Sequence, residues 1–107
     1  MSSNKPVSLK DIQAHLQRVC DEKGWSNNSI EQVFLLLNEE VGELAKAIRK
    51  KTNFLKESGR DEQQIDENLK EEVADVLNYL LEIANRFDVD LTDAYYDKFT
   101  INEDRTW

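Results

Sequence analysis

The sequence contains few residues that turn or interrupt secondary structure: three glycines and one proline among 107 residues. An all-β domain of this length would need a turn about every 8–12 residues, so the composition argues against one. Cys20 is the only cysteine, which excludes a disulfide framework and a cysteine zinc cluster. Its helical neighbours are apolar, so we expect a buried structural thiol in a reducing compartment.

Positive charge and long apolar runs are also scarce. The 14 lysines and arginines against 22 acidic residues give a net charge of −8, and no basic face for nucleic acid is evident. No apolar run approaches the ~20 residues of a membrane-spanning helix. The first 13 residues lack the apolar core of a signal peptide. We therefore expect a cytoplasmic protein with neither nucleic-acid nor membrane partners.

Helix-start and helix-stop residues are present instead. Ser8 is a good N-cap for a first helix, and Gly24 is placed to end it. Ser29 and Gln32 have the spacing of a capping box, which predicts a second, long helix running to about Lys51.

The second half continues this pattern. The polar stretch 52–68 predicts a loop with at most a short helical turn. A third helix is predicted from near Asn68 to near Phe87, and Asp90 or Thr92 could cap a fourth. The apolar stripe expected to be buried on the third helix comprises Leu69, Val73, Val76, Leu77, Leu80, Ile83, Ala84 and Phe87. The pattern predicts an all-α, four-to-five-helix bundle-like fold in a single domain, residues 1–107.

Two acidic pairs lie in or beside these stripes. Glu40 and Glu43 are three residues apart on the second helix, and Glu72 and Asp75 are three apart on the third. The two pairs can therefore face each other across a helix–helix interface. Four carboxylates in a partly dry groove repel one another, and a divalent cation removes that conflict. Oxygen ligands without histidine or cysteine suit Mg²⁺ or Mn²⁺.

Two other interpretations of the acidic residues remain to be weighed. They could be ordinary solvated helix surface, because glutamate is a good helix former and E-x-x-E arises by chance in acidic helices. A di-iron carboxylate bundle would need E-x-x-H pairs. The only histidine, His15, has Ile12 three residues before it, so the ligands for that site are missing.

The acidic motifs also carry a family resemblance. "EEVGEL" at 39–44 and "EEVADVL" at 71–77 resemble the paired E-E-x-x-E and E-x-x-D motifs of MazG-like all-α nucleoside triphosphate pyrophosphohydrolases, near the dCTP pyrophosphatases. The later "DKFTIN" adds to the likeness, which extends from about Trp25 to Arg105. It implies Mg²⁺-dependent hydrolysis of a (d)NTP to its monophosphate and pyrophosphate, with Mn²⁺ as a possible substitute. It further implies house-cleaning of the nucleotide pool by a homodimer or homotetramer.

The resemblance assigns roles to the carboxylates. It implies that Glu40, Glu43, Glu72 and Asp75 are the metal ligands. Glu39, which precedes the first ligand, would act with Glu40 in catalysis by orienting or deprotonating the attacking water.

The resemblance also suggests substrate contacts. Lys98 and Asn102 match a "K…IN" element and would reach the phosphates or the sugar, with Arg105 as a further cation. Plain surface charge is the alternative for the two cations. Trp25 would wall the base pocket or staple two helix ends, and Tyr79 would contact the base or belong to the core.

The chain departs from the family pattern at three places, and the first two leave the preferred base open. The spacing from His15 to Trp25 is one residue longer than in some dCTP pyrophosphatases, Lys50 replaces an aromatic residue, and segment 52–68 is longer and more charged. A non-catalytic acidic helical interaction protein is therefore kept as the competing function.

Overall fold

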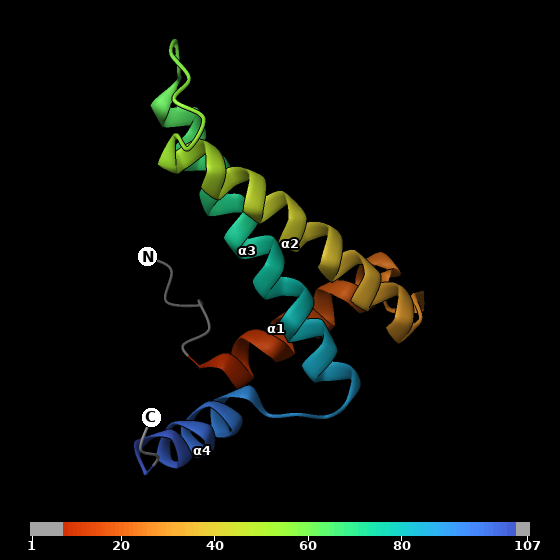
Figure 1. Ribbon diagram of the computed structural model, residues 1–107. Coiled ribbons are helices and arrows are strands. Elements are labelled where there is room, and N and C mark those ends of the chain that lie inside the picture. The colour runs from red at the N-terminus through yellow and green to blue at the C-terminus, as the bar shows by residue number, and fades with distance from the viewer. Residues whose placement is uncertain (1–7, 105–107) are drawn as a thin grey trace, which may run out of the picture. The chain divides into compact units, whose positions relative to one another are not determined.

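The computed structural model describes residues 8–104, which form four α-helices and, within that range, no strand (Figure 1). The helices are α1 (Leu9–Lys23), α2 (Ile30–Thr52), α3 (Glu62–Arg86) and α4 (Leu91–Glu103). A short 3₁₀ turn, η1 (Trp25–Asn27), lies between α1 and α2. The all-α prediction is therefore confirmed.

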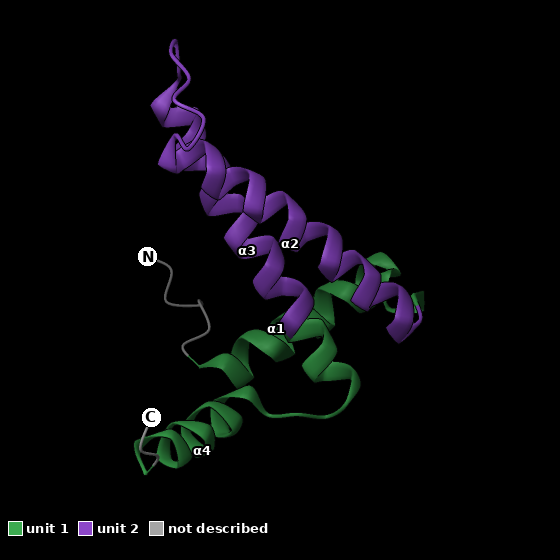
Figure 2. Cartoon of the chain, in the orientation of Figure 1, with its two compact units in different colours: residues 1–28, 81–107 green, residues 29–80 purple. Residues whose placement is uncertain are grey.

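The chain divides into two compact units (Figure 2). The terminal unit comprises residues 1–28 and 81–107, and the hairpin unit comprises residues 29–80. The boundary falls inside α3, between Leu80 and Leu81. All four carboxylates of the two acidic pairs belong to the hairpin unit.

The hairpin unit begins with the predicted capping box. The Ser29 hydroxyl accepts a hydrogen bond from the Gln32 N–H at 3.1 Å, and the Gln32 side chain accepts one from the Ser29 N–H at 2.8 Å. Helix α2 ends where Asn53 adopts a left-handed conformation with φ 54°, close to the predicted end. Its buried residues are Val33, Leu37 and Ala47.

The start of α3 corrects the prediction. The helix begins at Glu62 rather than near Asn68. Asp61 acts as its N-cap, because its carboxylate accepts from the Gln64 N–H at 3.2 Å and its carbonyl accepts from the Ile65 N–H at 3.1 Å. The run 62–68 is polar because its helical turns are largely solvated, and we took that polarity for a loop.

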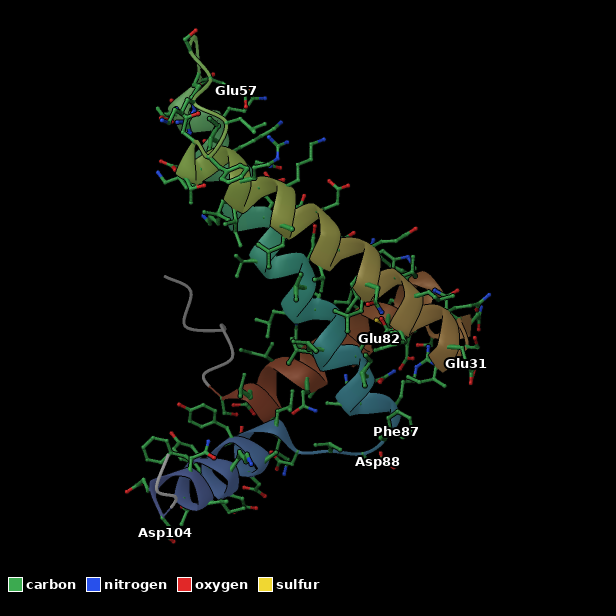
Figure 3. The ribbon with its side chains drawn as sticks, viewed as in Figure 1. Glu31, Glu57, Glu82, Phe87, Asp88 and Asp104 are labelled. Carbon is green, nitrogen blue, oxygen red and sulfur yellow. The ribbon has the colours of Figure 1, made fainter. Side chains whose placement is uncertain are left out.

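The connection between α2 and α3 is short and held by polar contacts. In the loop 53–61, the Asn53 side chain accepts from the Glu57 N–H at 2.8 Å and donates to the Glu57 carbonyl at 3.2 Å (Glu57 is labelled in Figure 3). Beyond it, Lys51 and Asp66 form an ion pair at 2.6 Å. The two helices consequently run antiparallel and side by side (Figure 1).

The terminal unit confirms several local predictions. Ser8 caps α1 by accepting from the Asp11 N–H at 3.0 Å, and Gly24 ends it with φ 73°. Cys20 is buried, and burial, followed by the nearby charge of Glu82, raises the pKa of its thiol. This is the environment of a structural cysteine.

A buried glutamine connects α1 with the two ends of the turn after α3. Gln13 donates through Nε2 to Asn85 Oδ1 at 3.1 Å and to the Val89 carbonyl at 2.7 Å, and its Oε1 accepts from the Leu91 N–H at 2.8 Å. Asn85 in turn donates to the Gln13 carbonyl at 3.0 Å. The network fixes the start of α4, which Asp90 caps.

Much of the predicted apolar stripe on α3 is exposed, which is a second correction. Its exposed members are Val73, Leu77, Leu80 and Phe87, the last in the turn after the helix (Figure 3). No residue of α4 is buried, and its exposed apolar or aromatic side chains are Tyr95, Tyr96, Phe99 and Ile101. An apolar helix face is stabilised when another surface covers it, and these side chains are exposed in the part of the chain that the structure describes.

Among residues 8–104, no helix combines the length and the apolar character required to cross a membrane.

Candidate metal centre

Helices α2 and α3 bring three carboxylates together. One oxygen each from Glu40, Glu72 and Asp75 lies within 4.8 Å of the other two. All three residues are half-buried. Glu40 reaches this position because it lies in the row that buries Leu37 and Ala47, three and seven residues away on α2. The predicted convergence of the two motifs is thus present for these three residues.

The cluster is electrostatically unsatisfied. Partial burial, a hydrogen bond with the Glu72 carboxyl, and the negative charges of Asp75, Glu72 and Glu43 raise the pKa of Glu40. That hydrogen bond requires a proton on one of the two carboxyls. Oε2 of Glu72 is buried and has no hydrogen-bond partner among residues 8–104.

Basic side chains do not neutralise the cluster. Among residues 8–104, no ion pair involves Glu40, Glu43, Glu72 or Asp75. Three cations of the hairpin unit are paired elsewhere, in the pairs Arg49–Glu57 at 3.8 Å, Lys51–Asp66 at 2.6 Å and Arg60–Glu62 at 3.2 Å. The negative charge of the cluster is therefore not offset by an ion pair among residues 8–104.

The donor set fits a hard divalent cation. Carboxylate oxygens without histidine or thiolate are the ligands that Mg²⁺ and Mn²⁺ accept. Two oxygens bound to one Mg²⁺ at about 2.1 Å lie roughly 3–4 Å apart, a scale similar to the spacing within this cluster. A cation would also satisfy the buried Oε2 of Glu72.

Two further acidic residues of the first motif lie on the outside of α2. Glu43 is exposed and does not belong to the group of three, although its charge contributes to the raised pKa of Glu40. Glu39 is exposed as well. Both assignments, of Glu43 as a ligand and of Glu39 as a catalytic residue, stay predictions.

The aromatic candidates lie in different units. Tyr79 is half-buried in the hairpin unit, one turn after Asp75 on α3. Trp25 belongs to the terminal unit, is 52% exposed, and has Lys23 Nζ 5.8 Å from its ring centroid. His15, in the same unit, is exposed. Contact of either aromatic residue with a base stays a prediction.

The predicted phosphate or sugar contacts lie on α4 and beyond it. Lys98 is exposed, and Asn102 lies one turn later and is half-buried. Oδ1 of Asn102 is buried without a hydrogen-bond partner among the described residues. Arg105 lies outside the described residues.

One feature of the hairpin unit was missed from the sequence. A pocket of about 310 Å³, here called the α2–α3 pocket, is lined by Glu43, Lys46, Lys50, Gln64, Ile65 and Asn68. The polarity of 64–68 predicts a loop, so the sequence pattern does not indicate the α3 wall of the pocket. The sequence "RDEQQ", with Asp61 at the N-cap position and Gln64 three residues later, was the available indication.

Comparison with known proteins identifies the family of this chain. Residues 28–102 match the model of the MazG nucleotide pyrophosphohydrolase domain, a range that includes both acidic motifs. Over 103 residues the chain is 29% identical to "Uncharacterized protein YpjD" of Bacillus subtilis (strain 168), covering 94% of this chain and 90% of that protein. The match extends over well more than half of the sequence, and the chain therefore belongs to the MazG nucleotide pyrophosphohydrolase domain family.

Proposed function

We propose that this protein hydrolyses a (d)NTP to the corresponding monophosphate and pyrophosphate in a Mg²⁺-dependent reaction, with Mn²⁺ able to substitute. The observation that carries the proposal is the buried, unpartnered Oε2 of Glu72 within the group of three carboxylates. Membership of the MazG family supplies the reaction class. House-cleaning of the nucleotide pool in the cytoplasm is the physiological role that we propose.

Three half-buried carboxylates, Glu40, Glu72 and Asp75, would hold the cation, and Glu43 would join them by turning from solvent. When bound, Mg²⁺ supplies charge neutralisation at the phosphates and a lowered pKa of a coordinated water. Glu39 would orient or deprotonate the attacking water. Its exposed side chain leaves it free to accept that proton.

Substrate contacts outside the carboxylates form a second part of the proposal. Lys98 and Arg105 would contact the phosphates electrostatically, and Trp25 and Tyr79 would contact the base. Asn102 would hydrogen-bond the sugar or a phosphate. The unpartnered Oδ1 of Asn102 supports such a contact, because a buried amide oxygen is normally paired.

We further propose that the working form is a homodimer or homotetramer. Helix α4 contains no buried residue although it carries Tyr95, Tyr96, Phe99 and Ile101. Val73, Leu77 and Leu80 on α3 are likewise exposed. A second copy of the chain would cover these apolar surfaces and complete the core.

The experiment is a pyrophosphate-release assay with a panel of canonical and modified (d)NTPs, on the wild type and Glu40→Gln, with Mg²⁺ and with EDTA. We expect metal-dependent release of pyrophosphate and a monophosphate, abolished in the variant. The substitution keeps the size of the side chain and removes its charge, so circular dichroism should show an unchanged fold.

A non-catalytic interaction protein is the competing function, and the exposed apolar side chains of α3 and α4 are the observation that favours it. It predicts no turnover of any nucleotide and no thermal stabilisation by Mg²⁺. That pair of results would reject the hydrolase proposal.

A further inference from the structure

The α2–α3 pocket lies next to the carboxylates along helices α2 and α3. On α2, residues 43, 46 and 50 are spaced three or four apart, so they lie on one side of the helix, and Glu43 lies one turn from Glu40. Glu43 belongs to the acidic motif and also lines the pocket. A rise of about 1.5 Å per residue places Lys46 about 9 Å along the helix from Glu40.

The other wall repeats this arrangement on α3. Residues 64, 68, 72 and 75 are again three or four apart and form one row. Asn68 lines the pocket and lies about 6 Å along the helix from Glu72. Along the groove between the helices, the side chains of the pocket therefore follow the carboxylates within one or two helical turns.

The pocket contains cations that have no internal partner. Among residues 8–104, neither Lys46 nor Lys50 forms an ion pair, whereas their neighbours Arg49 and Lys51 are paired with Glu57 and Asp66. Both free lysines line the pocket. Two ammonium groups one helical turn apart can bind one anion together.

Two further lining residues suit an anion that accepts hydrogen bonds, and Glu43 is the one lining residue with a negative charge. Gln64 and Asn68 each offer two amide N–H donors. Ile65 is the only apolar residue among those lining the pocket, and none of them is aromatic. The pocket therefore lacks the stacking surface on which a nucleobase usually binds.

From these observations we infer that the α2–α3 pocket is an anion subsite that takes the β- and γ-phosphoryl groups of the nucleotide and retains the pyrophosphate product. Lys46 and Lys50 bind the phosphate oxygens, and Gln64 and Asn68 donate hydrogen bonds to them. The inference rests on the proposed function, since it places the triphosphate with its α-phosphate at the carboxylates and its outer end in the pocket.

The test compares two double variants with the same change of charge. Lys46→Gln/Lys50→Gln removes both cations of the pocket. Lys56→Gln/Lys70→Gln is the control, because these exposed lysines of the same unit are also outside the ion pairs and do not line the pocket. Calorimetry measures the binding of inorganic pyrophosphate with Mg²⁺, and of the nucleoside monophosphate, to each full-length protein.

We expect the pocket variant to bind pyrophosphate about tenfold or more weaker than the wild type. The control should change less than about twofold, because screened, distant charges contribute little. Affinity for the monophosphate should be unchanged in both variants. In steady-state kinetics KM for the (d)NTP should rise with kcat preserved, and Lys46→Arg/Lys50→Arg should restore it.

The outcomes separate this inference from the proposed function. If the wild type hydrolyses nucleotides but the pocket variant keeps its KM and pyrophosphate affinity, the subsite is rejected and the hydrolase stands. If the pocket variant loses monophosphate affinity instead, the pocket takes the nucleoside, and the inference is again rejected. If no nucleotide is hydrolysed but pyrophosphate binding depends on the two lysines, the anion subsite is supported and the hydrolase fails.

Discussion

Gln13 in the terminal unit and Glu72 in the hairpin unit are both polar residues withdrawn from solvent, yet they are satisfied in opposite ways. Gln13 is 5% exposed, and its amide takes part in three hydrogen bonds with other groups of the chain. Glu72 has a buried oxygen with no partner and lies beside two further carboxylates.

The difference separates a structural polar group from one that we propose to bind a metal ion. The bonds of Gln13 join α1 to the segment around Asn85, Val89 and Leu91, so their effect is to hold that unit together. The unsatisfied oxygen of Glu72 lowers stability in the absence of a ligand. Residues kept in that condition mark a place where binding of a cation would offset the cost.

The largest expected effect is the loss of activity in Glu72→Gln. Removing one charge from the cluster should lower kcat by about a hundredfold or more, because a coordinated metal ion lowers the activation barrier by several kcal/mol. Pyrophosphate release measures it. If the variant keeps more than about a tenth of the wild-type kcat, Glu72 is not part of the catalytic site.

Substitution of Gln13 should lower the stability of the fold and leave catalysis unchanged. Gln13→Ala leaves the Leu91 N–H, the Val89 carbonyl and Oδ1 of Asn85 without the Gln13 amide, and should lower the free energy of unfolding by about 2–4 kcal/mol. Urea denaturation measures the change. Gln17→Ala on the same helix is the control, since Gln17 makes exposed or part-buried contacts, and it should cost less than about 0.5 kcal/mol.

Addition of Mg²⁺ should distinguish the two units directly. At a hundred times its dissociation constant, the cation should stabilise the wild type by about 2.7 kcal/mol, seen as a rise in Tm. Gln13→Ala starts from a lower Tm and should show the same rise on addition of Mg²⁺, whereas the Tm of Glu72→Gln should rise little. An equal rise in both variants would mean that Mg²⁺ binds somewhere else.

The smallest effect concerns pH. The pKa of Glu40 is raised in the folded protein, so its carboxyl holds a proton more tightly in the folded state than in the unfolded state. Its stabilising contribution is complete below the ordinary glutamate pKa of about 4.3 and is lost as the pH rises through the higher folded-state pKa. In EDTA, the Tm of the wild type should therefore rise relative to the Tm of Glu40→Gln as the pH is lowered from neutral to mildly acidic. A difference in Tm that does not vary with pH would contradict the raised pKa.

Local sequence determined most helix ends. Ser8, Gly24, Ser29 and Asp90 cap the described helices as their side chains or backbone freedom predict. The start of α3 differs from the prediction because residues 62–68 are polar apart from Ile65 and are largely exposed. Capping depends on neighbours within about four residues, which is why it can be predicted from sequence.

The carboxylate site was predictable in part. The spacing of the two motifs, in register with the apolar rows, indicated that Glu40, Glu72 and Asp75 would meet, and they do. Glu43 is exposed. A spacing of three residues does not predict this exposure, because the rotamer also decides where a side chain points.

By itself, then, the sequence determined the helical class, most of the caps and the pairing of two acidic motifs, since these depend on spacing along single helices. Tertiary structure alone decided which oxygen of Glu72 would be left without a partner and that Lys46 and Lys50 would share a pocket with Gln64 and Asn68. It also left Val73, Leu77 and Leu80 exposed. Burial and pairing depend on what lies across the groove between helices, and a pattern along one helix does not contain that information.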